Sequence, residues 1–222
     1  MLSLLRNSQS SSQVLTQSFV LLLVSVAALT DASLYLHSKE LLAVYITGDT
    51  SKLGAFASQG NFQKALPLAG IVMTFLISTS AAAWAENRLG RWRAPILLLA
   101  VGLLVLAAWP ASAPDYPYHL VILLALAMGA LNQVCSQEPG VTFVTGTLVK
   151  LGRAIAAGDF SGALPLLLRW FVWLIAAFIG AALDRHFPNA MLLIIAVWSL
   201  SLAGLHLLAQ GAAHRHGSHS RH

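Results

Sequence analysis

Two short Thr-Gly segments interrupt the hydrophobic sequence and carry most of the residues that could do chemistry. They are residues 45–54, YITGDTSKLG, and residues 143–152, FVTGTLVKLG. Glycine permits backbone turns that other residues adopt only at a cost, and threonine hydroxyls can cap a following helix. A helix broken inside a bilayer presents backbone N–H groups and a positive dipole end to a ligand. The alternative interpretation is a structural kink at which two helices cross closely.

Asp31 is an ionisable residue inside a hydrophobic run. Such a group is costly in a membrane and usually faces a partner or a wet cavity, so we interpret Asp31 as a proton or cation site. The alternative is a capping or packing carboxylate near the end of its helix. Asn132 occupies the corresponding place in the second half of the chain, once a gap of three residues is allowed. A single titratable carboxylate fits proton coupling through one site.

We therefore predict one small-solute or ion site built from both Thr-Gly segments. Its residues are Asp31, Asn132, Thr47, Gly48, Asp49, Thr50, Thr145, Gly146 and Thr147. Lys52 and Lys150 follow each segment by one helical turn and are secondary candidates. They could hold a negative group of a substrate, or extend to the lipid headgroups instead. No cofactor or metal site is predicted, and the single Cys135 excludes an intrachain disulfide.

The Thr-Gly segments belong to a longer internal repeat. Thr-Gly recurs after 98 positions (145 − 47), and the same register aligns further identities over the next twenty residues. These identities are Lys52/Lys150, Leu53/Leu151, Gly54/Gly152, Gly60/Gly158, Phe62/Phe160, Ala65/Ala163, Leu66/Leu164 and Pro67/Pro165. The segment is not of low complexity, so this agreement indicates an internal duplication.

Composition indicates that the duplication lies in a lipid bilayer. Charged residues make up 9% of the 222 residues and hydrophobic residues 57%. The mean hydropathy is +0.73. A soluble domain carries roughly 25% charged residues to cover its surface. The net charge of +5 comes from scattered basic residues without a basic stripe, which argues against nucleic acid as a partner.

The hydrophobic pattern predicts an all-α polytopic membrane bundle of two repeats. We expect a disordered leader at 1–15, a first repeat at 16–110, a Pro-rich loop at 111–117, a second repeat at 118–209 and a His/Arg-rich tail at 210–222. Each repeat holds about three full spans, and each Thr-Gly segment is too short and interrupted for a further ordinary span. Pro67 and Pro165 are expected in the first turn of their helices. Glu86 and Asp184 each close a span and mark a membrane boundary.

Basic residues decide between two topologies. If the Thr-Gly helices do not cross, the repeats are inverted and both termini lie on the cytoplasmic side. Eight basic residues are then inside and four outside, the direction of the positive-inside rule. The inside set is Arg6, Arg88, Arg91, Arg93, Lys150, Arg153, Arg215 and Arg221, and the outside set is Lys39, Lys52, Lys64 and Arg185. If the Thr-Gly helices cross, the repeats are parallel and the arginine tail is outside.

The Thr-Gly segments, with Asp31 before the first and residues 127–132, AMGALN, before the second, resemble the YoaK-type family of bacterial multi-pass membrane proteins. The resemblance extends over about residues 16–209, and the second Thr-Gly segment is its most specific part. Two departures are Asp49, where the family usually has Asn, and Leu29-Thr30, where it has Gly-Phe. The resemblance implies an uncharacterised protein of the bacterial inner membrane and supplies no reaction.

Three classes of function remain open from the sequence. The first is a small secondary transporter or channel for a small solute or ion, with its site at the paired Thr-Gly breaks. The second is a non-transporting scaffold, assembly factor or sensor, in which small residues such as Gly48 and Gly54 let helices approach and a homo-oligomer can form. The third is an intramembrane enzyme acting on lipid or isoprenoid. We predict no enzyme, because no acid, base and nucleophile set can be named.

Overall fold

The computed structural model describes residues 2–38, 41–135 and 140–219, and within them every regular element is a helix. Residues 1 and 220–222, the ends of the predicted leader and tail, and Lys39 lie outside the described residues. The eight α-helices of the described ranges are α1 Leu2–His37, α2 Ile46–Ser58, α3 Phe62–Leu89, α4 Arg93–Ala108, α5 Tyr118–Leu131, α6 Val144–Ala156, α7 Phe160–His186 and α8 Met191–His219. Short 3₁₀ turns are η1 Gly90–Trp92, η2 Trp109–Ala111 and η3 Pro188–Ala190.

Five helical segments are long and apolar enough to cross a membrane, so the predicted polytopic helical bundle is confirmed. They are Thr16–His37, Phe62–Ala85, Gly90–Ala111, Phe160–His186 and Met191–Gly211. We predicted about six full spans, and the sixth, α5, has only 14 residues. Its length of about 21 Å is short of the roughly 30 Å hydrocarbon core. α5 ends early because Asn132 takes the C-cap position and turns its side chain to the next loop.

α1 extends beyond the predicted span at its beginning. The apolar span Thr16–His37 agrees with the sequence, but the helix begins at Leu2 and includes the Ser/Gln-rich leader for which we predicted disorder. The leader contains no proline or glycine to stop the helix, so the backbone continues the turn geometry of the span.

The prediction that the repeated prolines occupy a first helical turn is wrong. α3 and α7 begin five residues before Pro67 and Pro165. Their starts are fixed instead by Asn61 and Asp159, which are also 98 positions apart. The Asp159 carboxylate accepts a hydrogen bond from the Gly162 N–H at 2.9 Å, and Asn61 Oδ1 accepts one from the Lys64 N–H at 3.4 Å.

α2 and α6 are short helices that form hairpins with α3 and α7, respectively. Each ends next to a glycine with positive φ, +68° at Gly60 and +70° at Gly158. Glycine is favoured there because other residues enter the left-handed region at a cost. The two glycines are 98 positions apart, so the same conformational requirement applies at both positions of this register.

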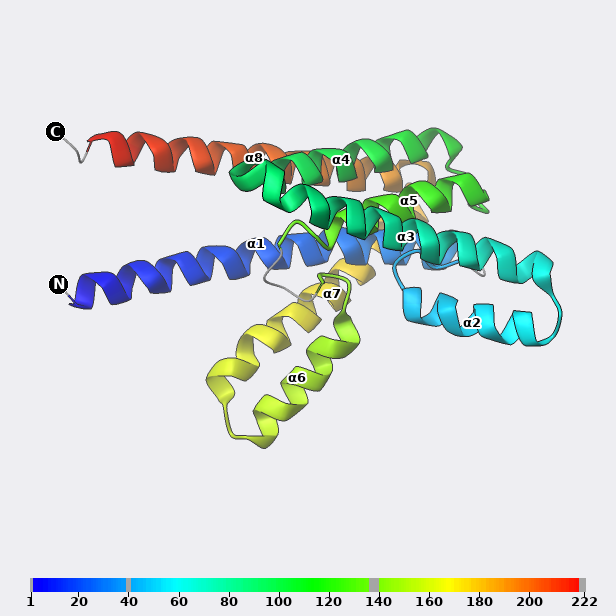
Figure 1. Cartoon of the computed structure of the whole chain (residues 1–222), viewed down its shortest axis with the longest axis horizontal. Coiled ribbons are helices and arrows are strands. Elements are labelled where there is room, and N and C mark those ends of the chain that lie inside the picture. The colour runs from blue at the N-terminus through cyan, green and yellow to red at the C-terminus, as the bar shows by residue number, and fades with distance from the viewer. Residues whose placement is uncertain (1, 39–40, 136–139, 220–222) are drawn as a thin grey trace.

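The helices of the two halves are interleaved. α1 packs on α7 and α3 packs on α5, while α4 packs on both α8 and α5 (Figure 1). The buried core lies along the middle of α1, α4, α5 and α8, with fully buried Leu23, Leu98, Leu124 and Ile195. Each partner of the strongest pairs thus comes from a different half, so neither half has its own core.

The two hairpin turns point toward opposite ends of the bundle. The chain termini share one end, and the α2–α3 turn lies at the other (Figure 1). Tyr118 Oη, at the start of α5, donates to the Pro67 carbonyl, which places the start of α3 beside the α4–α5 loop. The α6–α7 hairpin leaves the side of the bundle at an angle, with its turn toward the half that carries the termini (Figure 1), and Asp159 of this turn lines one cavity with Gln17 of α1.

Candidate functional site

A cavity of about 840 Å³ lies where α2 and α6 begin. Its walls come from α1, α3 and α7, from the end of α5, and from the two segments that lead into α2 and α6. The lining residues are Asp31, Val44, Tyr45, Ile46, Thr47, Phe75, Thr79, Asn132, Gln133, Gly140, Thr142, Phe143, Val144, Thr145 and Trp173. The cavity is large enough for a small organic molecule.

Four of the predicted site residues meet in this cavity: Asp31, Asn132, Thr47 and Thr145. They come from α1, the end of α5, and the first turns of α2 and α6. The other predicted residues are not among those that line it, namely Gly48, Asp49, Thr50, Gly146, Thr147, Lys52 and Lys150. The structure therefore divides the predicted set into residues that face the cavity and residues that support the two short helices.

Many lining residues form pairs that are 98 positions apart. The residue numbers of each pair differ by 98 (142 − 44, 143 − 45, 144 − 46, 145 − 47 and 173 − 75). The pairs are Val44/Thr142, Tyr45/Phe143, Ile46/Val144, Thr47/Thr145 and Phe75/Trp173. Positions related by the 98-residue register therefore meet around one space. The pair Phe75/Trp173 adds aromatic walls that we did not single out in the sequence, although the register of 98 contained that signal.

α2 and α6 begin at the cavity with the same backbone geometry. Tyr45 has φ −94° and ψ 63°, and Phe143 has φ −87° and ψ 64°. Neither N-cap side chain makes a capping hydrogen bond. The first-turn N–H groups of a helix have no acceptor within the helix, and the helix dipole adds partial positive charge at this end. Two positive helix ends therefore meet the cavity with the carboxylate of Asp31.

Gly48 and Gly146 lie in the first turns of these helices for a different reason from the one we inferred. Both have ordinary helical backbone, since neither has positive φ. A Cβ at Gly48 would collide with the Tyr45 ring, and one at Gly146 would collide with the Phe143 ring. The glycines leave room for an aromatic ring that folds back over the first turn. The expectation of a special backbone turn at Thr-Gly is therefore wrong.

Asp31 is half-buried and is the one charged side chain among the described residues that line the cavity. Within the described part of the chain, no hydrogen bond or ion pair joins its carboxylate to another group. The capping alternative required a bond to Thr30, Tyr35 or the Thr-Gly backbone. Thr30 bonds to the Val26 carbonyl within its own helix instead. Asp31 thus keeps its acceptor capacity for the contents of the cavity.

A family model described as a protein of unknown function, DUF1275, matches residues 19–205. The chain belongs to this family. The matched region contains all eight helices in whole or in part, together with every residue that lines the cavity. No curated protein and no solved structure matches the chain.

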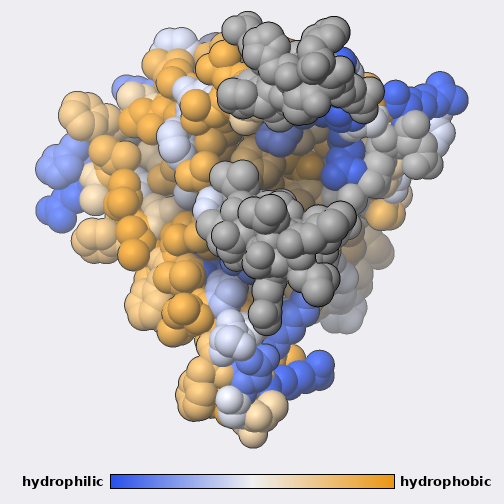
Figure 2. Space-filling view, turned by 90° about the vertical axis from the view of Figure 1, so that its left-hand side faces the viewer, coloured by the Kyte–Doolittle hydropathy of each residue, from blue (hydrophilic) through white to orange (hydrophobic). Residues whose placement is uncertain are grey.

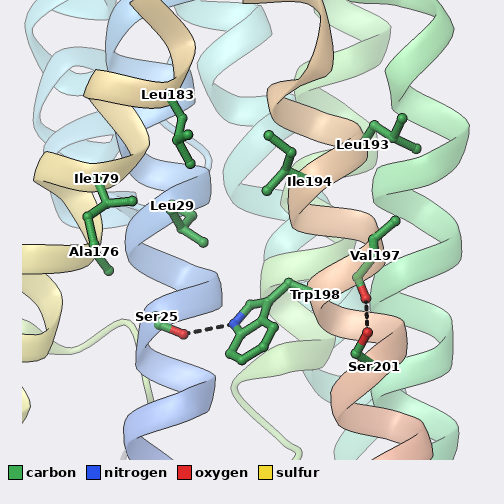
Figure 3. Close-up of a pocket in the computed structure, with 10 residues that line it drawn as sticks. All are labelled: Ser25, Leu29, Ala176, Ile179, Leu183, Leu193, Ile194, Val197, Trp198 and Ser201. Carbon is green, nitrogen blue, oxygen red and sulfur yellow. Dashed lines mark hydrogen bonds between the residues drawn. The ribbon is translucent and has the colours of Figure 1, made fainter. Parts of the chain in front are cut away.

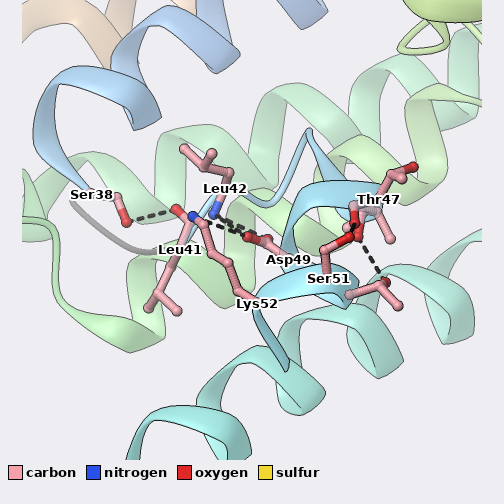
Figure 4. Close-up of polar contacts among 9 residues, drawn as sticks. Ser38, Leu41, Leu42, Thr47, Asp49, Ser51 and Lys52 are labelled. Atoms are coloured by element: carbon pink, nitrogen blue, oxygen red, sulfur yellow. Dashed lines mark hydrogen bonds and ion pairs between the residues drawn. The ribbon is translucent and has the colours of Figure 1, made fainter. Parts of the chain in front are cut away.

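In this DUF1275 member, Asp49 is fully buried and supports the loop before α2 (Figure 4). Both carboxylate oxygens accept from the Leu42 N–H, at 3.2 and 3.1 Å. The Lys52 ammonium lies 3.9 Å from Oδ1, one turn along the helix. Burial raises the pKa of Asp49 to about 6, and the Leu42 hydrogen bond opposes that rise. Asp49 and Lys52 thus form a structural group rather than a second charge in the cavity.

Asn132 has the same supporting role in the second half of the DUF1275 chain. Its amide nitrogen donates to the Met128 carbonyl at 3.0 Å and to Thr142 Oγ1 at 3.1 Å. Its amide oxygen accepts from the Thr142 N–H at 3.1 Å. The side chain fixes the segment that leads into α6, so it shapes the cavity wall. The hydroxyls of Thr50 and Thr147 bond to carbonyls one turn back, at Ile46 and Phe143.

Lys150 lines a separate cavity of about 500 Å³, between α1 and the α6–α7 hairpin. Asp159, which caps α7, lines the same cavity, and the Gly162 hydrogen bond holds the pKa of this carboxyl below its usual range. Lys150 therefore does not reach the central site. Among the described residues, no group of three or more His, Cys, Asp or Glu side chains could hold a metal ion.

An apolar groove of about 530 Å³ separates α7 from α8 in this family member (Figure 3). Leu29 and Ser25 of α1 lie between the two helices, and the Trp198 indole N–H donates to Ser25 Oγ at 3.0 Å. The figure shows Ile179 and Leu183 on one side and Ile194 and Val197 on the other. Leucine, isoleucine and valine side chains make up most of its lining, so this groove has the character of a lipid-facing surface.

Proposed function

We propose that this DUF1275 member is a small secondary transporter or channel for a small solute or ion. The observation that carries the proposal is the central cavity. It joins the starts of two short helices, equivalent in the 98-residue register, with Asp31 as its one charged lining side chain among the described residues. Transporters built from inverted repeats place their sites where broken helices meet, with the positive helix ends toward the ligand.

We infer that the two halves are inverted repeats with three crossings each, and that α2 and α6 enter the membrane without crossing it. Three features support this topology: the shared end of the termini, the opposite directions of the hairpin turns, and the cross-pairing of α1 with α7 and of α3 with α5. In this arrangement α5 crosses despite its length, with the polar segment after Leu131 completing the path. The positive-inside rule then puts both termini in the cytoplasm.

The resemblance to the YoaK-type family supports a bacterial inner membrane as the location. The bilayer is the surrounding solvent, because the five apolar helices expose large hydrophobic side chains such as Leu76, Phe178 and Leu208. We propose no enzymatic activity, no cofactor and no nucleic-acid partner.

We propose that Asp31 couples movement of the solute to protons. A carboxylate that accepts no hydrogen bond from the described residues can gain and lose a proton as the cavity fills and empties. The two helix starts carry partial positive charge, so protonation of Asp31 makes the cavity more favourable to an anionic group. One titratable group in the path gives one proton in each cycle.

The experiment uses purified full-length protein in liposomes that contain a pH-sensitive dye. Gradients of amino acids, organic anions, organic cations and inorganic ions are applied in turn. We expect one class to move protons with wild-type protein, and Asp31→Asn to abolish that movement. Asp159→Asn is the matched control, because Asp159 is exposed and lies outside the central cavity. Thr145→Trp, which fills the cavity from α6, is expected to block flux without loss of the folded protein.

Inactivity of both wild type and Asp31→Asn with every class of solute would contradict transport and favour the scaffold or sensor. That alternative gains no support from Gly54, where an added methyl group would meet nothing within 4 Å, so no helix of the described chain approaches there. A scaffold further predicts that Thr145→Trp changes only stability. Proton movement by wild type that Asp31→Asn retains would contradict the role of Asp31 and leave transport standing.

A further inference from the structure

Another cavity, of about 730 Å³, lies at the end of the bundle that carries both termini. Four parts of the chain form it: the beginning of the apolar span in α1, the η1–α4 corner, the segment after α5, and the middle turns of α8. It shares no lining residue with the central cavity. The proposed transport site therefore does not account for it.

The lining of this cavity combines cationic and apolar residues. It includes the side chains of Arg91 and Arg93, and no acidic residue is among the described residues that line the space. Leu22, Leu202 and Leu205 supply an apolar part, beside the polar residues Thr16, Ser18, His206 and Gln210. Figure 2 faces this end of the molecule and shows hydrophobic residues along one flank, with hydrophilic residues at the outer edges of the face. A cationic wall next to an apolar wall matches a ligand with an anionic head and a hydrocarbon chain.

Contacts between the elements hold this cavity in shape. Arg93 Nη2 donates to the Val134 carbonyl at 3.2 Å, which fixes α4 against the segment after α5. Gln210 Nε2 donates to the Arg91 carbonyl at 2.7 Å, which fixes α8 to η1. The rings of Phe19 and His206, with centroids 4.9 Å apart, join α1 to α8. The two arginines are therefore presented by a built framework.

Arg91 is positioned as a headgroup ligand would require. Its side chain is exposed, and its guanidinium lies 5.2 Å from the centroid of the Trp92 ring. Tryptophan is enriched at the level of the lipid headgroups, and arginine binds phosphate oxygens through a planar fork. The neighbouring Arg88 has the same arrangement over Trp84, at 4.1 Å. This corner of the molecule thus presents cations at the depth of the phosphates.

We propose that this cavity binds one anionic phospholipid, with its phosphate at Arg91 and Arg93 and an acyl chain along the apolar wall. The apolar wall favours a lipid over a free phosphate, because a free anion would leave it hydrated. Basic pockets between helices on the cytoplasmic side of membrane proteins recognise anionic headgroups. The proposal needs only membrane insertion and does not depend on transport.

The test measures the melting temperature of detergent-purified protein during titration with phosphatidylglycerol, phosphatidylcholine or inorganic phosphate. We expect saturable stabilisation by phosphatidylglycerol alone. Arg91→Gln is expected to weaken the apparent affinity about fivefold, and Arg91→Gln with Arg93→Gln about 25-fold, from roughly 1 kcal/mol per arginine. Arg185→Gln is the matched control. It removes an exposed charge in the last turn of α7, and Arg185 does not line this cavity.

Blocking the apolar wall tests the acyl chain separately. Ala209→Trp places a large ring in the cavity from α8 and is expected to reduce the phosphatidylglycerol response while both arginines remain. Equal stabilisation by phosphatidylcholine would overturn the proposal, and so would full affinity in Arg91→Gln. Equal stabilisation by inorganic phosphate would also overturn it, by showing a site for a free anion. Because Arg91 is exposed, the single variant Arg91→Gln is expected to fold. If the double variant fails to fold, the affinity of Arg91→Gln for phosphatidylglycerol decides the question.

Discussion

His37 Nε2 lies 2.8 Å from Asp184 Oδ2 and joins the end of α1 to the end of α7 across 147 residues of sequence. The other ring nitrogen, Nδ1, lies 2.9 Å from the Pro114 carbonyl in the α4–α5 loop. The Pro114 carbonyl can only accept a hydrogen bond, so Nδ1 donates to it. The Tyr116 ring stacks on His37, with centroids 4.7 Å apart, and its hydroxyl lies 2.7 Å from Ser33 Oγ.

Asp184→Asn is expected to destabilise the protein where the ends of α1 and α7 meet beside the α4–α5 loop. The change removes the negative partner of His37 from a site where the two side chains are 12% and 8% exposed. Hydrogen bonds to charged groups contribute about 1.5–3 kcal/mol, and we expect a loss of that size. Thermal unfolding in detergent measures it, with the exposed neighbour Arg185→Gln as the control. An unchanged melting temperature would show that the pair contributes no net stability.

Gly48→Ala and Gly146→Ala are expected to destabilise the protein because the new methyl group collides with the Tyr45 or Phe143 ring. Forcing a ring out of place typically costs about 1–3 kcal/mol. Gly54→Ala and Gly152→Ala are matched controls in the same two helices, where a methyl group meets nothing within 4 Å. The controls are expected to stabilise by about 0.5–1 kcal/mol, since alanine is the better helix former.

A double-mutant cycle tests whether the Tyr45 ring causes the destabilisation by Gly48→Ala. Tyr45→Ala removes the ring, so Gly48→Ala in the Tyr45→Ala background should cost much less than in wild type. The same cycle applies to Phe143 and Gly146. Circular dichroism melts of the four proteins in each cycle give the coupling energy. If the cost of Gly48→Ala were the same in both backgrounds, the ring would not be the reason for the glycine.

Asp31 and Asp49 are expected to respond differently to replacement. Asp49→Ala leaves the Leu42 N–H without its acceptor in a buried place, which costs about 1–3 kcal/mol. Asp31→Ala removes a carboxylate with no hydrogen bond to the described chain, so its melting temperature should stay near that of wild type. Expression level and thermal unfolding measure both. A larger loss from Asp31→Ala would show that this carboxylate is structural.

The difference in stability between Asp49→Asn and wild type is expected to depend on pH. The amide that replaces the carboxylate keeps one oxygen for the Leu42 N–H and carries no charge. The raised pKa of Asp49, about 6, means that its ionised form is disfavoured in the folded protein. Its contribution to stability is therefore complete below pH 3.8, the ordinary value, and is lost as the pH rises through 6. We expect Asp49→Asn to gain on wild type above pH 6 and to match it at low pH. Thermal unfolding across this pH range measures the difference. If the difference in stability between Asp49→Asn and wild type were the same at all pH values, the raised pKa of Asp49 would be contradicted.

Site-directed labelling tests the inverted topology. In a Cys135→Ser background, Gln59→Cys marks the α2–α3 turn and Ala157→Cys marks the α6–α7 turn. Both positions are exposed. A membrane-impermeant maleimide added to intact cells is expected to label only the first, and the second only after the membrane is opened. Labelling of both from the same side would mean parallel repeats.

Local polarity in the sequence was enough to predict the hydrophobic helices, the two interrupted segments and the placement of Asp31 within a span. These features depend on residues close together in the chain, because the bilayer selects long apolar helices whatever their neighbours. The register of 98 also linked positions that share a conformation, such as Gly60 with Gly158. The short α5 departed from the pattern because Asn132 bonds to Thr142 rather than extending the helix.

Which face of each helix meets which neighbour was decided by the tertiary structure alone. Asp49 looked equivalent to Asp31 as a site residue, yet it turns to the Leu42 N–H while Asp31 faces the cavity. His37 and Asp184 gave no sign of pairing, because no spacing relates two ends of different helices. Helix rotation and crossing depend on how side chains interlock over the whole interface, and that information is distributed across both halves of the chain.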